Sequence, residues 1–180
     1  MRVEVQDTCC VVIDYQEKIV PTMYQKEVLL QNSVTLLKGL AALSVPMLLT
    51  TQYAKGLGCN VPEIREAMGN PKELDKTTFS VYETSAIAEA IQGTGKKNVL
   101  ICGIEAHICV LQSAIDLKAA GYQPVIVADC VSSRTEENIR LGLKRAEQEG
   151  ILITSKEAIL FELTRRAGGD VFKQISALIK

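Results

Sequence analysis

Three continuous apolar runs, all rich in β-branched residues, constrain the fold of this chain most. They are Cys-Cys-Val-Val-Ile at residues 9–13, Asn-Val-Leu-Ile-Cys at 98–102 and Pro-Val-Ile-Val-Ala at 124–128. None of them alternates between apolar and polar residues, a pattern typical of parallel strands that are buried on both faces. Shorter runs at 46–50 and 150–154 bring the predicted strands to at least five.

Helical patterns separate these runs. Apolar residues recur at helical spacing in two of the intervening segments: Leu30, Val34, Leu37 and Ala41, then Val110, Ala114 and Leu117. Alternating strands and helices predict βαβ units, hence an α/β protein with a mostly parallel, doubly wound sheet and helices on both faces. We expect one domain over residues 1–180 and interpret residues 54–72 as a long loop excursion.

Composition and charge exclude several classes of function. Lys and Arg number 20 against 21 Asp and Glu, so a net charge of −1 offers a nucleic acid no overall attraction. The apolar runs are far shorter than the roughly 18 residues that a membrane span needs. Residues 1–7 lack the features of a signal or transit peptide, which predicts a cytoplasmic protein.

The six cysteines are predicted to be reduced. Cys9, Cys10, Cys102 and Cys130 lie in or beside the apolar runs, where a free thiol behaves as a small hydrophobic group. His107 is the only histidine, so a Cys/His zinc site has too few ligands. We therefore expect neither a metal nor another cofactor.

Residues that can carry chemistry follow two of the predicted strands. Asp14 comes directly after residues 9–13, and residues 103–109 follow 98–102, so both belong at the sheet edge where ligands bind. Cys109 stands where a helix is expected to begin, and the helix dipole there would favour a thiolate. Taken alone, Cys109 could equally be a buried hydrophobic residue and Asp14 a helix or turn cap.

Three motifs together resemble the isochorismatase-like cysteine hydrolases. They are Val12-Ile-Asp14-Tyr-Gln16, Lys76-Thr-Thr-Phe-Ser80 and Gly103-Ile-Glu-Ala-His-Ile-Cys109. Each is weak by itself, but their order and their places at strand ends are specific. The resemblance covers nearly the whole chain, including the turn at residues 132–134, and implies a three-layer αβα fold with a six-stranded sheet.

The resemblance also implies how the site residues act. Cys109 is expected to be the nucleophile, Asp14 the general base, and Lys76 a cation that lowers the pKa of both. It further implies a cis peptide between Ile104 and Glu105, with the backbone N–H groups of Glu105 and Cys109 forming an oxyanion hole. The substrate would be a small molecule with an amide or related C–N bond, cleaved through a thioester, as in an amidohydrolase. Isochorismatases proper lack this cysteine and cleave a vinyl ether.

The chain departs from the nicotinamidases of this superfamily. These bind a metal through an Asp-x-His region, where this sequence has Thr-Thr-Gln-Tyr-Ala-Lys-Gly-Leu-Gly at 50–58. A metal-free enzyme of nicotinamidase type remains an alternative. Candidate pocket residues, which could instead be core or cap residues, are Gln16, Gln52, Tyr53, Phe79 and His107.

Two alternatives lie outside hydrolysis. The chain could be a scaffold that keeps the fold without catalysis, because folds outlive functions. It could also be a redox-sensing thiol protein, with Cys59 or Cys10 resolving an oxidised Cys109. Apolar helical surfaces and the family resemblance predict a homo-oligomer.

Overall fold

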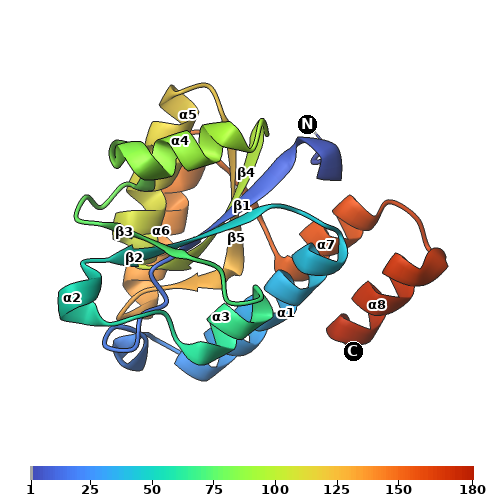
Figure 1. Ribbon diagram of the computed structural model, residues 1–180, viewed down its shortest axis with the longest axis horizontal. Helices are drawn as coiled ribbons and strands as arrows, with labels where there is room; N and C mark the ends of the chain where they lie inside the picture. The colour runs from blue at the N-terminus through green and yellow to red at the C-terminus, as the bar shows by residue number, and fades with distance from the viewer. Residues whose placement is uncertain (1) are drawn as a thin grey trace.

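The computed structural model describes residues 2–180 and shows six parallel strands between two layers of helices (Figure 1). The strand order is β3-β2-β1-β4-β5-β6. The strands are β1 (Thr8–Ile13), β2 (Met47–Gln52), β3 (Glu73–Lys76), β4 (Asn98–Ile104), β5 (Gln123–Ser132) and β6 (Leu152–Thr154). The α-helices are α1 (Lys26–Ala42), α2 (Ala54–Leu57), α3 (Pro62–Ala67), α4 (Ser85–Gly93), α5 (Leu111–Ala119), α6 (Glu136–Gln148), α7 (Lys156–Thr164) and α8 (Gly169–Ile179). Short 3₁₀ turns are η1 (Val5–Asp7), η2 (Val20–Thr22) and η3 (Val81–Glu83), and η4 (Ala106–Val110) is a π-helical turn.

Each face of the sheet has its own apolar core. On β1, Cys10 and Val12 point to one face while Cys9, Val11 and Ile13 point to the other, and all five are fully buried. Buried residues of α1, α3, α7 and α8 cover the first face, and those of α4, α5 and α6 cover the second. In Figure 1, α1, α7 and α8 lie on one side of the strands and α4 and α5 on the other. This double burial explains why the strands read as unbroken apolar runs.

The predicted α/β class and its parallel sheet are confirmed, and the sheet is parallel throughout. All five predicted strands form. Residues 73–76 add the sixth as the edge strand β3, which pairs with β2. Because β3 is short and charged, it has no apolar run from which a strand could be predicted.

Two local expectations were wrong. Residues 54–72 are not an irregular excursion, because they contain α2 and α3; Pro62 sits in the first turn of α3, where proline is favoured. In α1, Leu37 of the expected stripe is fully buried and Leu30 and Val34 pack against the core, but Ala41 is exposed. Leu29, Leu36 and Leu40 are also buried, so the apolar face of α1 is wider than the spacing predicted.

The topology places a crevice beside β1. The chain moves outward from β1 to β2 and β3, then returns to the other side of β1 for β4, β5 and β6. Ligands of open α/β sheets bind beyond the carboxyl ends of the strands at such a switch point. Ile13 and Gly103, paired at the ends of β1 and β4, therefore mark where a site is expected.

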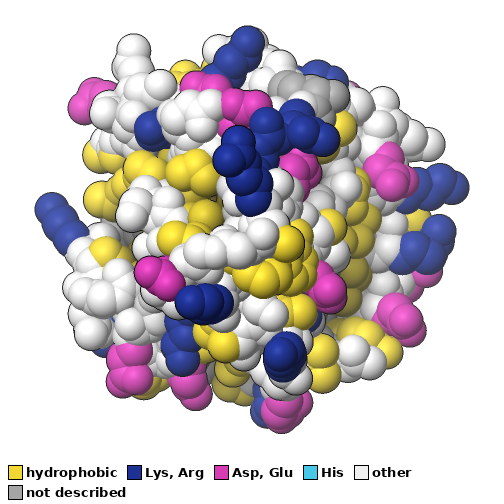
Figure 2. All heavy atoms as spheres, turned by 90° about the vertical axis from the view of Figure 1, so that its right-hand side faces the viewer, with side chains coloured by type: hydrophobic (Ala, Val, Ile, Leu, Met, Phe, Trp, Pro, Cys, Tyr) yellow, Lys and Arg dark blue, Asp and Glu magenta, His cyan; other side chains and the backbone are white. Residues whose placement is uncertain are grey.

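The surface carries charges of both signs. On the face shown in Figure 2, basic and acidic side chains are interspersed with apolar ones. Within residues 2–180, none of the helices has the length and apolarity that crossing a bilayer requires.

Gly103 provides a test of the close approach between β1 and β4. Its φ is +147°, and an added Cβ would overlap the carbonyl oxygen of Ile13 and lie 2.6 Å from the Ile13 Cβ. We expect Gly103→Ala to lower the free energy of unfolding by about 1–3 kcal/mol or more, as overpacking does. Gly93→Ala is the control, since no atom lies within 4 Å of that added Cβ. Equal stabilities of the two variants in urea unfolding would contradict this packing.

Candidate active site

Asp14 directs a buried carboxylate into the switch-point crevice. It follows β1 with φ of +58°, in the left-handed region that Asp tolerates better than most residues. The backbone turns there, and Gln16 N–H donates to the Asp14 carbonyl at 2.7 Å. The Asp14 residue is 1% exposed.

Lys76 ends the edge strand β3 and reaches back over β2. Its Nζ donates to Asp14 Oδ2 at 2.7 Å, to Gln52 Oε1 at 2.6 Å and to the Thr78 carbonyl at 3.3 Å. Three acceptors match the three N–H bonds of an ammonium. A buried ion pair needs this kind of complete pairing to offset its desolvation.

Thr50 completes the surroundings of the Asp14 carboxylate. It is the register partner of Ile13 on β2, and its Oγ1 donates to Asp14 Oδ1 at 2.8 Å. Each carboxylate oxygen is therefore bound by one neighbour. Sequence reasoning gave Thr50 no role, although its place near the carboxyl end of a predicted strand beside Asp14 was the available signal.

Cys109 lies in the π-helical turn η4, between β4 and α5. Its thiol lies near Asp14 and the backbone of Glu105, and both act on its pKa. The residue is 6% exposed, so little of it reaches solvent. The structure thus brings together Cys109, Asp14 and Lys76, the three residues predicted to act together.

The expected thiolate is not the resting state of this site. Burial and the negative charge of Asp14 raise the pKa of Cys109 to about 12, and the opposing effect of Lys76 is smaller. Burial likewise raises the pKa of Asp14 above its usual value, against the lowering effect of Lys76. The ammonium and the helix dipole can be inferred from the sequence, but the desolvation of the thiol depends on the folded structure. Near neutral pH Cys109 is a thiol and needs a base to become a nucleophile.

A cavity of about 320 Å³ opens onto this group. Its walls combine the reactive side chains with three isoleucines, an exposed aromatic ring and an arginine. The lining residues are Asp14, Ile19, Gln52, Phe79, Ile104, Glu105, Ile108, Cys109 and Arg134. Of the five candidate pocket residues, Gln52 and Phe79 lie on this wall.

The other three candidate pocket residues lie outside the cavity wall. Gln16 is buried and links β1 to β2, accepting from Gln52 N–H and donating to the carbonyls of Gln52 and Gly58. Tyr53 is half-exposed, with its ring against Gly56. His107 places Nδ1 2.9 Å from Ser133 Oγ. Each has a structural partner that the sequence could not reveal.

Glu105 joins the backbone of the site to an arginine that sequence reasoning left without a role. The peptide bond between Ile104 and Glu105 is cis. The Glu105 carboxylate places Oε1 2.9 Å from Arg134 Nε and Oε2 3.7 Å from His107 Nδ1. Arg134 follows β5 in the turn at 132–134, so the carboxyl ends of β4 and β5 meet here.

The remaining thiols differ from Cys109. All six cysteines, which lie within the described chain, are free. Cys10 is fully buried, and its pKa is raised well above the usual value by the neighbouring Cys102 thiol and by burial. Such a thiol cannot readily reach or attack an oxidised Cys109, which argues against its proposed resolving role. Cys59 is exposed.

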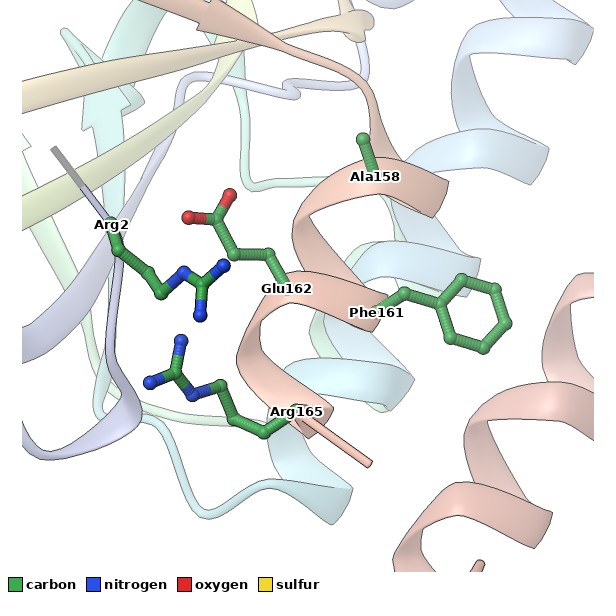
Figure 3. Close-up of a pocket in the computed structure, with 5 residues that line it drawn as sticks. All are labelled: Arg2, Ala158, Phe161, Glu162 and Arg165. Atoms are coloured by element: carbon green, nitrogen blue, oxygen red, sulfur yellow. The ribbon is translucent and has the colours of Figure 1, made fainter. Parts of the chain in front are cut away.

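A second hollow, of about 350 Å³, lies against α7 and the N-terminal segment. Figure 3 shows the guanidinium groups of Arg2 and Arg165 facing each other beside the Glu162 carboxylate, with Phe161 pointing away. No cysteine lines it, so the chemistry predicted from the sequence belongs to the cavity at Cys109. Across residues 2–180, no three His, Cys, Asp or Glu side chains are grouped so that they could hold a metal ion.

Comparison with known proteins assigns the family. The model described as "Isochorismatase domain" matches residues 8–158. The chain belongs to the isochorismatase family. It is 38% identical to the "Secreted isochorismatase effector Isc1" of Phytophthora sojae, over 94% of this chain and 82% of that protein. It is 35% identical to "Isochorismatase domain-containing protein 2" of Danio rerio, over 99% and 89% respectively.

A solved structure shares the whole architecture of this isochorismatase-family chain. The structure titled "Structure of MAR1 Ribonuclease from Caenorhabditis elegans" superposes with a TM-score of 0.93 at 33% identity, covering 99% of this chain and 92% of that one. The three-layer fold expected from the motifs is thereby confirmed. The Phytophthora sojae relative is called a secreted effector, and a cytoplasmic location stays a prediction for this chain.

The raised pKa of Cys109 predicts that one substitution changes its alkylation rate and the rate of hydrolysis in opposite directions. Asp14→Asn removes the negative charge that raises this pKa, so the thiol should ionise more readily and react several-fold faster with iodoacetamide near pH 8. The hydrolysis expected from the motifs should fall in the same variant, because the expected general base is lost. Alkylation is followed by peptide mass spectrometry, with Asp75→Asn as the control. Slower alkylation of Cys109 in Asp14→Asn would contradict the assigned electrostatics.

The buried ion pair gives a stability prediction. Lys76→Met leaves the Asp14 carboxylate buried without its cation, and breaking such a pair costs about 3–5 kcal/mol. Lys144→Met removes an exposed lysine of α6 and should change stability by no more than about 0.5 kcal/mol. Chemical denaturation at neutral pH measures both. A Lys76→Met protein as stable as Lys144→Met would show that the pair contributes little.

Proposed function

We propose that this isochorismatase-family chain is a cysteine hydrolase that cleaves a C–N bond of a small amide. The observation that carries the proposal is that the Cys109 thiol and the Asp14 carboxylate meet at one open cavity, with the Lys76 ammonium paired to Asp14 behind its wall. A neutral thiol beside an ionised carboxylate is a nucleophile paired with its base. The ammonium is held by three acceptors and keeps that carboxylate charged inside the protein.

The first half of the reaction follows from these positions. Asp14 accepts the proton of the Cys109 thiol while the sulfur bonds to the amide carbon, and the C=O electron pair moves onto oxygen. The backbone N–H groups of Glu105 and Cys109 are proposed to stabilise that oxygen. When the C–N bond breaks, its electron pair leaves with nitrogen, which takes the proton from Asp14. Ammonia or an amine departs, and an acyl thioester remains on Cys109.

The second half returns the enzyme to its starting state. Asp14 takes a proton from water, the resulting hydroxyl bonds to the thioester carbon, and the C–S bond breaks. The sulfur regains a proton through Asp14, and a carboxylic acid leaves. Lys76 holds Asp14 in place through both proton transfers and stays protonated itself.

The wall of the cavity favours acyl transfer over cleavage of a phosphodiester. The name of the Caenorhabditis elegans neighbour calls that protein a ribonuclease. Here the cavity presents a thiol beside the Asp14 carboxylate, four apolar side chains and a single arginine that is paired with Glu105, and the chain has a net charge of −1. RNA is accordingly a control substrate for this chain.

The family membership and surface apolar residues such as Val28 also support the expectation of a homo-oligomer.

Cys109→Ala tests the proposed nucleophile. Hydrolysis of a panel of small primary amides, followed by ammonia release, should fall by roughly 10³-fold or more. Cys59→Ala removes the exposed cysteine and should leave turnover unchanged. Ordinary activity in Cys109→Ala would refute the mechanism. An inactive wild-type chain across the panel would favour the scaffold alternative.

A further inference from the structure

Arg134 stands at the mouth of the same cavity as Cys109. It belongs to the turn between β5 and α6, and it lines the cavity together with Glu105 and the apolar residues Ile104 and Ile108. Its side chain is 60% exposed, so it meets both solvent and any molecule that enters. A charge at this place faces the part of a substrate that lies away from the scissile bond.

One edge of the Arg134 guanidinium is already fixed. Its Nε lies 2.9 Å from Glu105 Oε1, and the Glu105 side chain is itself mostly buried. Within residues 2–180 the recorded polar contact of this side chain is the one made by Nε, and the two terminal nitrogens have none. Glu105 therefore orients the planar group while leaving its terminal N–H donors available.

No other cation on the cavity wall can serve a ligand. Among the lining residues Arg134 is the only basic one. Lys76 lies behind the wall, and its Nζ already donates to Asp14, Gln52 and the Thr78 carbonyl. Ile19, Phe79, Ile104 and Ile108 supply apolar surface between the two polar ends. The cavity is thus built for a molecule with a reactive carbonyl and a separate group that accepts hydrogen bonds from Arg134.

We infer that Arg134 is a specificity-determining residue that binds a carboxylate on the acyl part of the substrate. The substrate class would be small monocarboxylic acids that carry an amide at the other end of a short apolar chain. This inference rests on the proposed cysteine chemistry and deepens it. A guanidinium binds carboxylates through parallel N–H bonds, which a point charge cannot reproduce.

The charges around the cavity balance, which affects how an anion could be bound there. Asp14 is paired with Lys76 and Glu105 with Arg134, so these four groups sum to zero and give an anion no net attraction. Selectivity would then come from directed N–H donors at one place in the cavity. Arg134→Lys, which keeps the charge without the fork, should therefore recover little of the selectivity lost in Arg134→Met.

The experiment uses reversible binding, so that it does not need turnover. Succinic semialdehyde and butyraldehyde both offer an aldehyde, but the first carries a carboxylate where the second ends in a methyl group. The Cys109 thiol adds to the aldehyde: an S–C bond forms, the C=O electron pair goes to oxygen, and the thiol proton follows through Asp14. The adduct protects Cys109 from iodoacetamide, and peptide mass spectrometry measures that protection.

We expect succinic semialdehyde to protect wild-type Cys109 at a concentration at least about tenfold lower than butyraldehyde. In Arg134→Met this ratio should approach one, and in Arg134→Lys it should stay low. Arg140→Met is the matched control, because Arg140 is also exposed and paired with a glutamate, on α6. It should keep the wild-type ratio.

Two results would overturn the inference. Equal protection by the two aldehydes in the wild-type protein would show that the cavity does not select a carboxylate, and this result requires no variant to fold. A ratio that survives in Arg134→Met would assign the selectivity to another group. Failure of the proposed function is distinct, because then neither aldehyde would protect Cys109 or amide hydrolysis would persist in Cys109→Ala.

Discussion

The buried ion pair between Asp14 and Lys76 is the constraint on which the rest of the site depends. A carboxylate 1% exposed and an ammonium 2% exposed are both costly to remove from water, and they are tolerable together because Nζ and Oδ2 lie 2.7 Å apart. To form the pair, the edge strand β3 must deliver Lys76 across β2 to the end of β1. The sheet order, with β2 and β3 outside β1, satisfies that requirement. Thr50 and Gln52 at the end of β2 then bind the two partners from the strand between them.

This pair also determines the state of the sulfur. A cation beside a thiol ordinarily favours the thiolate, yet here the ammonium is bound to the carboxylate, and the carboxylate faces the sulfur. The nearer negative charge and the burial of Cys109 together outweigh Lys76. In the proposed mechanism the site therefore holds a neutral thiol beside a carboxylate, and the nucleophile forms only when a proton moves from one to the other. An unprotected thiolate would be exposed to oxidation between turnovers, whereas a buried thiol with a raised pKa is not readily oxidised.

Much of the architecture could be predicted from the sequence because strands buried on both faces appear as continuous apolar runs. Residues 9–13 and 98–102 read as unbroken apolar runs, and both became central strands. No such apolar run marks the edge strand at 73–76 or the helices within 54–72. These elements are short and partly exposed, and tertiary contacts determine their structure. The motifs located Asp14, Lys76 and Cys109. They could not show that Thr50 binds Asp14 or that Arg134 reaches the cavity, because those contacts join different strands and depend on register and turn geometry. Nor could they show that burial controls the pKa of Cys109.

The same geometry separates the proposed reactive groups from the groups that face the rest of a substrate. The ion pair and the sulfur are held by β1, β3 and η4, which belong to the rigid sheet and its adjoining turn. The groups that face the rest of a substrate come from elsewhere: Ile19 from the segment after β1, Phe79 from the segment after β3, and Arg134 from the turn after β5. Changes in those segments would alter what the cavity accepts without moving the reactive atoms. Arg134 is paired with Glu105, whose backbone lies near the sulfur, so a group bound by the arginine would be held in a fixed relation to Cys109. In the proposed mechanism, selectivity and reactivity are thus joined through Glu105, the residue after β4.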